Sequence, residues 1–201
     1  PKFQYKDYIG WSRQFKTCPA YKNQEKYWLN VYKNSVSPLN LNTDFPRPPF
    51  QSFNGRKHYF TLEKNLFEGI KRIAADNGAT LYHALLAAWY VLLYRYSGQE
   101  DIVVGTPVAG RPHADLENVV GMFVNTIAMR GFPHGDQSFL EFLKQTKDMS
   151  LAAIDNQHYE FFELVNKLNI RRDGSRNPLF DVLFVLQNAG DITCDTDKFK
   201  M

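Results

Sequence analysis

Aromatic residues recur at helical spacing in two stretches near the start of the chain. In residues 3–15 and again in residues 21–32, they fall on one face of an α-helix. The pattern predicts two amphipathic helices, separated at Cys18-Pro19. The residues that form the two faces are Phe3, Tyr8, Trp11 and Phe15 in the first stretch, and Tyr21, Trp28, Leu29 and Tyr32 in the second.

Prolines, then a predicted strand and a predicted helix, mark the next part of the chain. Four prolines between residues 35 and 54 remove backbone donors, so this stretch is expected to be an irregular connector. Residues 55–62 are predicted to form a strand. Residues 63–76 carry an apolar helical stripe that stops at Asn77-Gly78, a pair typical of a helix end.

A long apolar helix is predicted at the centre of the core. In residues 81–96, every residue except His83 and Arg95 is apolar or aromatic, and Thr80 can cap the helix. Such a helix packs on a sheet, and strands are predicted at 101–108, 123–130 and 180–187. Further helices are expected at 138–154 and 160–168. The chain is therefore predicted to be a single α/β domain over residues 1–201, with a mixed sheet flanked by helices.

Composition and charge exclude several classes of function. With 44% hydrophobic and 15% aromatic residues, the chain can fill a core. Its net charge of only +3 gives no basic stripe for nucleic acid. The uncharged apolar run at residues 84–94 is too short to span a membrane. Cys18 and Cys194 lie far apart, which favours reduced thiols and a cytoplasmic location.

The sequence contains no catalytic or metal-binding pattern. The five histidines are scattered, with no second histidine at i+4 and no carboxylate cluster nearby, so no metal site is expected. The patterns of serine hydrolases, P-loop enzymes and dinucleotide-binding dehydrogenases are missing as well. No catalytic residue is therefore assigned.

Two segments place polar residues and turn formers beside apolar runs. In residues 121–126, Asn125 and Thr126 interrupt a predicted strand, and we expect them to bond another backbone segment or to line a channel. In residues 172–179, Asp173 and Arg176 are close enough to form an ion pair within the loop. The alternative is that Arg176 anchors this loop across a domain boundary.

Four segments, in order, resemble the second half of the condensation domains of nonribosomal peptide synthetases. Residues 5–11 (Y-K-D-Y-I-G-W) resemble the family's Y-x-D-[FY]-A-V-W helix. Residues 120–126 (V-G-M-F-V-N-T), closed by Arg130, resemble [IV]-G-x-F-V-N-T. Residues 156–163 (N-Q-H-Y-E-F-F-E) resemble [HN]-Q-D-[YV]-P-F-E, with His158 and Glu160 where the family usually has Asp and Pro. Residues 172–179 match R-D-x-S-R-N-P-L throughout.

The resemblance implies a fold of two chloramphenicol-acetyltransferase-like lobes around a tunnel, of which this chain is the C-terminal lobe. The family's catalytic motif, H-H-x-x-x-D-G, belongs to the N-terminal lobe, and this sequence has no two adjacent histidines. The chain is therefore expected to be a piece of a longer polypeptide and to be inactive alone. The candidates for the tunnel or lobe interface are Gly121, Phe123, Asn125, Thr126, Asp173, Arg176 and Asn177.

The family joins a carrier-tethered aminoacyl or peptidyl thioester to an aminoacyl acceptor through an amide bond. The implied partners are the N-terminal lobe, donor and acceptor peptidyl carrier proteins with phosphopantetheine arms, and an adjacent adenylation domain. The chain itself is expected to bind no cofactor. The alternatives are an epimerisation domain, which the G-x-F-V-N-T form disfavours, a coenzyme-A-dependent acyltransferase, and a carrier-binding module without chemistry.

Overall fold

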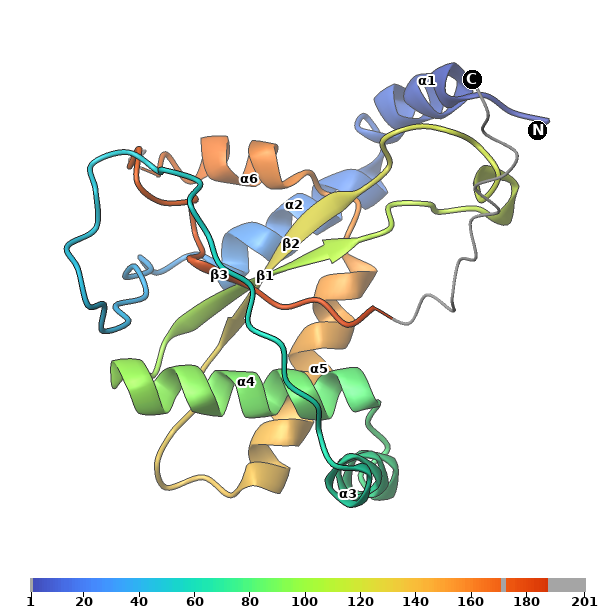
Figure 1. Cartoon of the computed structure of the whole chain (residues 1–201). Helices are drawn as coiled ribbons and strands as arrows, with labels where there is room; N and C mark the ends of the chain where they lie inside the picture. Colours follow the sequence, from blue (N-terminus) through green and yellow to red (C-terminus); the bar gives the residue numbers. More distant parts are fainter. Residues whose placement is uncertain (1, 171–172, 188–201) are drawn as a thin grey trace, which may run out of the picture.

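The computed structural model describes residues 2–170 and 173–187, and a three-stranded sheet lies at its centre (Figure 1). The strands follow the order β2-β1-β3, with β1 at Ile102–Val108, β2 at Asn125–Gly131 and β3 at Val182–Leu183. β1 runs antiparallel to β2 along its whole length, from Ile102 opposite Gly131 to Val108 opposite Asn125. Because β1 runs parallel to β3, the sheet is mixed, as predicted.

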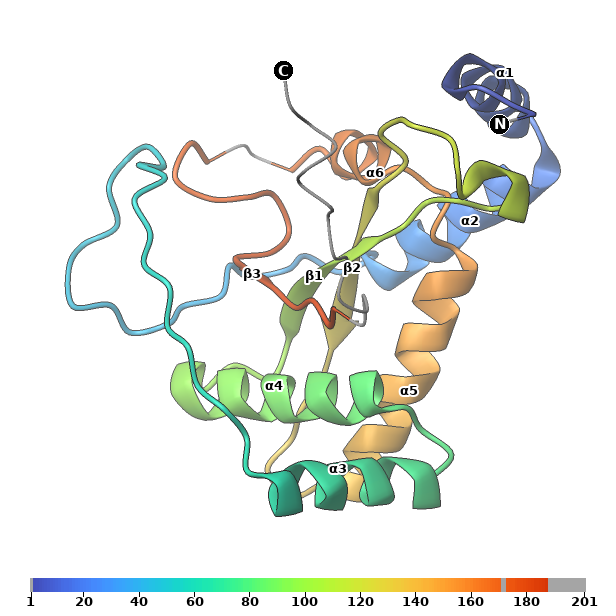
Figure 2. The ribbon, with the colours of Figure 1, turned by 45° about the vertical axis from the view of Figure 1, so that its right-hand side comes forward.

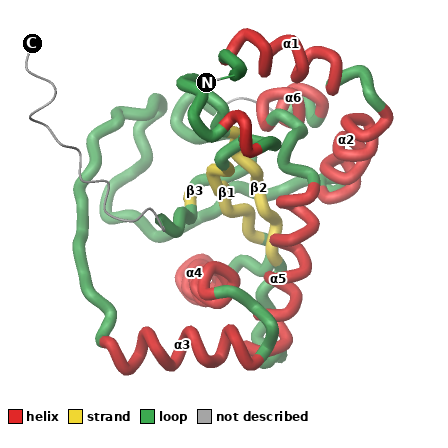
Figure 3. The backbone as a smooth tube through the Cα atoms, turned by 90° about the vertical axis from the view of Figure 1, so that its right-hand side faces the viewer, coloured by secondary structure: helices red, strands yellow, loops and turns green. Residues whose placement is uncertain are grey.

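Helices flank this sheet on more than one side. Figures 2 and 3 show α2, α5 and α6 on the β2 side, whereas the connector between α2 and α3 runs on the β3 side. Every α-helix begins and ends within two residues of its predicted range. Their bounds are Tyr5–Phe15 (α1), Pro19–Val31 (α2), Lys64–Asp76 (α3), Leu81–Ser97 (α4), Phe139–Asp155 (α5) and Phe161–Lys167 (α6).

The predicted central helix, α4, lies in the middle of the core. Leu86, Ala87 and Tyr90 are completely buried, and the Tyr90 hydroxyl donates to the Met129 carbonyl of β2 at 2.9 Å. The predicted start is confirmed, because the Thr80 side chain accepts a hydrogen bond from the backbone of the third helical residue. Gly98, at φ 67°, ends the helix in the left-handed conformation.

Two of the predicted strands differ from the structure. Residues 55–62 are extended, but they pair with no strand in ranges 2–170 and 173–187, so the predicted strand is wrong for this chain. The predicted strand at 180–187 is shortened to Val182–Leu183, although the Phe184 N–H still donates to the Gly105 carbonyl at 2.9 Å. A strand requires hydrogen bonds to a neighbour, and local sequence does not say where that neighbour lies.

A small second core joins α1 to the loop between β1 and β2. In Figure 1, α1 and this loop project together from the body of the molecule. The loop contains the short 3₁₀ helix Ala114–Leu116. The residues of this second core are Leu116, Val119 and Phe123 from the loop, packed against Phe3, Tyr5 and Tyr8.

Candidate functional site

Phe123, in the first motif segment, points into the second core. Only 4% of its surface is exposed, and its ring lies 5.2 Å from the ring of Tyr5 and 4.6 Å from that of Tyr8. The Arg111 guanidinium stacks 4.1 Å from the centre of the same Phe123 ring, a cation–π contact. Phe123 therefore holds α1 against the loop and is a packing residue.

Residues on either side of Phe123 show which faces of this segment are covered. A Cβ on Gly121 would lie 2.3 Å from the Tyr5 ring, so glycine permits the close approach of α1. The intervening side chains face outward: Val120, Met122 and Val124 are 94%, 75% and 57% exposed. The sequence prediction missed these three, because alternation along an extended segment groups them on one side without showing which side is exposed.

Asn125 bonds another backbone segment, the first of its two predicted roles. Its Nδ2 donates to the carbonyls of Gln157 at 2.8 Å and Tyr159 at 3.0 Å, and its Oδ1 accepts from the Phe161 N–H at 3.4 Å. The side chain thus ties the start of β2 to the third motif segment. Asn125 and its half-buried neighbour Thr126 also line a hollow of about 410 Å³ between α1 and residues 157–162.

The hollow has an aromatic wall along α1. Tyr8, Trp11 and Phe15 stack in succession, with centroid distances of 5.9 and 5.0 Å. The His158 ring meets the Phe15 ring edge-on at 5.8 Å. Burial lowers the pKa of His158 below its ordinary value, so its ring is neutral at pH 7.

Charged groups close the end of this hollow near α6. Lys16 lies 2.8 Å from both the Glu160 and the Glu163 carboxylates, and the Tyr21 hydroxyl donates to Glu163 at 2.7 Å. Burial opposes ionisation of Glu163, yet hydrogen bonds from Lys16 and Tyr21 bring its pKa below the ordinary value. Burial and the neighbouring Tyr5 and Glu160 raise the pKa of Tyr8. These groups fix the bend between α1 and α2 against α6.

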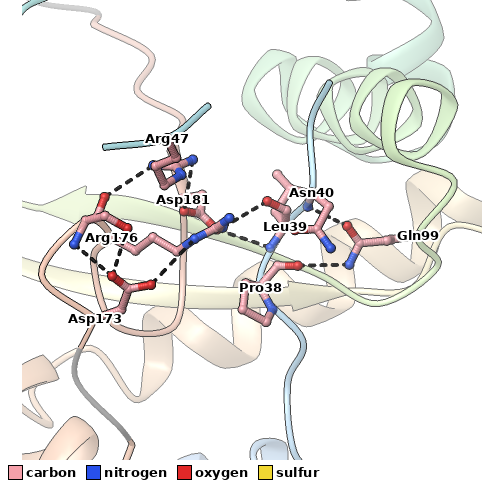
Figure 4. A network of polar contacts seen from close by, with 9 residues as sticks. Pro38, Leu39, Asn40, Arg47, Gln99, Asp173, Arg176 and Asp181 are labelled. Carbon is pink, nitrogen blue, oxygen red and sulfur yellow. Dashed lines mark hydrogen bonds and ion pairs between the residues drawn. The ribbon is translucent and has the colours of Figure 1, made fainter. Parts of the chain in front are cut away.

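Arg176 is the centre of the second motif segment, and its partner lies outside that segment (Figure 4). Its guanidinium donates to the Asp181 carboxylate at 2.7 Å and to the Leu39 carbonyl at 3.1 Å. The predicted ion pair with Asp173 is at the limit of contact, at 4.0 Å. Arg176 therefore anchors the loop to the connector between α2 and α3, and no local pattern in the sequence indicates Asp181 as its partner.

The remaining residues of this loop have structural partners or line a second hollow. Asp173 accepts hydrogen bonds from the backbone and hydroxyl of Ser175, both at 2.8 Å, which lower its pKa. Asp173, Arg176 and Asn177 line a hollow of about 630 Å³ beside the end of α2. Arg172, the first residue of the fourth motif, and Cys194 lie outside the described residues.

Comparison with known proteins identifies the family. The family model described as "Condensation domain" matches residues 1–200. The chain belongs to the condensation domain family. It is 53% identical over 190 residues to Gramicidin S synthase 2 of Brevibacillus brevis, covering 94% of this chain and 4% of that protein. It is 52% identical over 185 residues to Bacitracin synthase 3 of Bacillus licheniformis, covering 92% of this chain and 3% of that protein.

Solved structures show the same fold for this condensation-domain chain. The four domain nonribosomal peptide synthetase holo-AB3403, bound to AMP and glycine, is 31% identical with a TM-score of 0.78, over 92% of this chain and 13% of that one. The X-domain from teicoplanin biosynthesis is 22% identical with a TM-score of 0.82, over 90% of this chain and 41% of that one. The predicted α/β fold, a chloramphenicol-acetyltransferase-like arrangement with a mixed sheet flanked by helices, is confirmed.

Metal-ligating clusters and membrane-spanning helices are missing from the described part of this condensation-domain chain. Within residues 2–170 and 173–187, no group of three His, Cys, Asp or Glu side chains is placed to hold a metal ion. In the same ranges, no helix is both long and apolar enough to cross a membrane.

Replacing Asn125 with aspartate is expected to lower the free energy of unfolding by about 2 kcal/mol, because a carboxylate would face the carbonyls of Gln157 and Tyr159. Asn77→Asp is the matched control. Asn77 donates to the Ile73 carbonyl at 2.8 Å from an exposed helix end, and its loss is expected to cost under about 1 kcal/mol. Urea unfolding followed by circular dichroism measures both variants. Equal losses would show that Asn125 does not hold the third motif segment.

Proposed function

We propose that this chain is the C-terminal lobe of an amide-forming condensation domain in a nonribosomal peptide synthetase. The observation that carries the proposal is the 53% identity to Gramicidin S synthase 2 over 94% of this chain. The chain spans less than a tenth of the length of that protein and of Bacitracin synthase 3. The proposal therefore assigns it one part of an activity that a larger polypeptide carries out.

In the proposed reaction, the amine of a carrier-tethered aminoacyl acceptor attacks the thioester carbonyl of a carrier-tethered donor. A C–N bond forms, the C–S bond breaks, and the donor carrier leaves as a thiol. Phosphopantetheine arms on the two carrier proteins hold the substrates, and this chain contributes no catalytic residue. Its share is positional, since fixing two tethered reactants in one geometry accounts for a large part of such a rate enhancement.

The motif residues support this positional role. Gly121, Phe123 and Asn125 fix the segment 120–126 from its inner face, and Thr126 lines the hollow beside α1. This leaves Val120, Met122 and Val124 as the side chains that face a second lobe or a substrate. Arg176 holds the 173–181 loop in place, with Asp173 and Asn177 beside it. The proposed partners are the N-terminal lobe, donor and acceptor carriers, and an adjacent adenylation domain. The cytoplasmic location stays a prediction.

Reconstitution with loaded carriers tests the proposal. The 201-residue chain alone is expected to form no dipeptidyl thioester, because the sequence has no H-H-x-x-x-D-G motif. A longer polypeptide of the same synthetase that includes this motif is expected to form it, with mass spectrometry of the acceptor carrier as the measurement. Product formed by the 201-residue chain alone would contradict the assignment.

A titration separates the proposed lobe from an acyltransferase, and analysis of the product separates it from an epimerisation domain. The lobe and a carrier-binding module without chemistry both predict saturable binding of carrier protein. An acyltransferase predicts saturable binding of coenzyme A instead. Inversion of the donor's stereocentre without amide formation by the longer polypeptide would identify an epimerisation domain.

A further inference from the structure

The hollow between α1 and residues 157–162, here called the α1 hollow, has aromatic walls. Its volume of about 410 Å³ falls within the range of about 300–1,000 Å³ in which proteins bind small ligands. Tyr8, Trp11 and Phe15 stack along its α1 side. Figure 2 shows α1, α6 and the loop between β1 and β2 at the same end of the molecule. Stacked rings of this kind cover an aliphatic chain and attract a cation to their faces.

Glu160 supplies the charge in the wall of the α1 hollow. Among the described residues that line it, only Glu160 is charged at pH 7. Its Oε1 lies 2.8 Å from the Lys16 ammonium, whereas its Oε2 has no hydrogen-bond partner within residues 2–170 and 173–187. Lys16 lies equally close, at 2.8 Å, to Glu163. One ammonium against two carboxylates leaves this end of the hollow with a net charge of −1.

This negative charge acts on other groups of the hollow. Burial is the largest cause that raises the pKa of Tyr8 and of Tyr21, and the Glu160 carboxylate adds to both shifts. An anion in the α1 hollow would therefore be repelled. A wholly apolar group would cover the free Glu160 oxygen without giving it a hydrogen bond, which costs free energy. The wall therefore favours a cation.

A primary ammonium on a flexible aliphatic stem fits this wall. It has three N–H donors, and the acceptors without a partner among the described residues are Glu160 Oε2, the His158 imidazole and the Thr126 hydroxyl. Its stem can lie along the aromatic rings while the ammonium reaches the carboxylate. A guanidinium instead forms its best contacts with both oxygens of a carboxylate, and one oxygen of Glu160 is already bound to Lys16. The geometry thus selects a lysine-type side chain.

The position of the α1 hollow indicates where this ammonium comes from. Met122 and Val124, two of the outward side chains that the proposed function assigns to a second lobe or a substrate, also line the hollow. The hollow is thus continuous with that surface. His158 and Glu160 stand where the family's pattern has aspartate and proline, so the charged group lies at a position that the pattern does not use. A charge at such a position is suited to selecting one substrate from others.

We propose that the α1 hollow is a subsite for the lysine-type side chain of a carrier-tethered aminoacyl group. The proposal rests on the proposed function and adds a substrate class to it. In the intact synthetase, the aromatic wall covers the stem of this side chain, and its ammonium bonds Glu160 Oε2. The subsite takes no part in the bond exchange at the thioester. It holds the tethered group by a part that does not react.

Competition between two amino acids tests the subsite in the longer polypeptide that includes the H-H-x-x-x-D-G motif. Equal amounts of carrier loaded with lysine and with norleucine, which has the same stem without the ammonium, compete for a partner carrier loaded with alanine. They are offered first as acceptors and then as donors, which identifies the carrier that the hollow serves. In one arrangement, mass spectrometry is expected to show about tenfold more lysine product. Equal products in both arrangements would overturn the proposal.

Variants of Glu160 show whether this preference comes from the α1 hollow. Glu160→Gln removes the charge but leaves Lys16 bound to Glu163, so the preference is expected to fall to about twofold or less. Glu160→Asp keeps a carboxylate and is expected to keep most of the preference. Glu100→Gln is the matched control, because Glu100 is similarly exposed, 53% against 45%, and pairs with His134 outside the hollow. A tenfold preference that survives Glu160→Gln would overturn the assignment.

A titration of the 201-residue chain followed by NMR tests cation binding without the reaction. Nα-acetyl-lysine methylamide is expected to shift the Trp11 indole N–H and the backbone amides of residues 158–160, and the norleucine compound to shift them less. Equal shifts, or none, would overturn the cation site. Shifts without a lysine preference in the synthetase would overturn the substrate subsite. If neither amino acid gave a dipeptidyl thioester, the proposed function would fail, whereas equal products would refute the subsite alone.

Discussion

Replacing Arg130 with methionine is expected to lower the free energy of unfolding of this chain by about 4 kcal/mol. The Arg130 side chain is only 5% exposed, and it donates to both carboxylate oxygens of Asp101, at 2.8 and 2.6 Å. It also donates to three carbonyls at the end of α2, those of Val31 at 2.9 Å, Asn34 at 3.1 Å and Ser35 at 3.3 Å. Methionine fills much of the same space but leaves all of these acceptors without a donor.

Two further variants test whether this loss comes from the hydrogen bonds. Arg47→Met is the matched control, because Arg47 is 42% exposed and lies 3.7 Å from Asp181; its loss is expected to cost under about 1 kcal/mol. Arg130→Lys keeps the charge without the planar fork, so an intermediate loss is expected. Urea unfolding at pH 7 gives the three values. If Arg130→Met lost no more than Arg47→Met, the buried contacts would not be what joins α2 to the sheet.

Elements that carry their own local signals could be predicted closely from the sequence. α5 begins after Ser138, whose hydroxyl accepts from the Glu141 N–H while the Glu141 carboxylate accepts from the Ser138 backbone. α4 has the corresponding cap at Thr80 and a left-handed glycine at Gly98. These bonds join residues three or four positions apart, so a short window of sequence contains both partners.

Features that depend on distant partners could not be predicted. Arg130 could be recognised as part of a motif, but the three carbonyls that accept from it, at and just after the end of α2, lie 95 to 99 positions away. The partner of Arg176 is only five positions along, yet a turn had to bring Asp181 back to it. The predicted strand at 55–62 is wrong for the same reason: a strand needs a paired neighbour, and the described residues supply none there.

In the candidate site, too, the local sequence identifies a segment, but distant elements determine how its side chains are oriented. The motif at 120–126 identifies an important segment, but it does not tell which alternate residues face the protein. Phe123 and Asn125 are inward because α1 and residues 157–161 cover that side. The outward set, Val120, Met122 and Val124, follows only once those covering elements are placed.

Replacing Gly110 with alanine is expected to open the loop between β1 and β2 and to cost about 3 kcal/mol or more. Gly110 has a φ of 64°, and a Cβ at this position would lie 1.8 Å from the Phe123 carbonyl oxygen. The backbone of the loop must therefore move away from Phe123. Because Phe123 holds Tyr5 and Tyr8 of α1, the second core is expected to separate from the sheet along with the loop.

Gly98→Ala is the matched control for this variant. Gly98 has nearly the same φ, 67°, but a Cβ there would meet nothing within 4 Å, so only the backbone strain of about 1 kcal/mol is expected. Hydrogen exchange distinguishes the two effects. In Gly110→Ala, amides of α1 and of residues 113–124 are expected to exchange faster while those of α4 keep their protection. In Gly98→Ala, α1 is expected to be unaffected. Equal losses of stability in the two variants would mean that the contact with Phe123 does not decide the position of α1. The loop would then accommodate the Cβ added at position 110 with no loss of unfolding free energy beyond the strain of an alanine at positive φ.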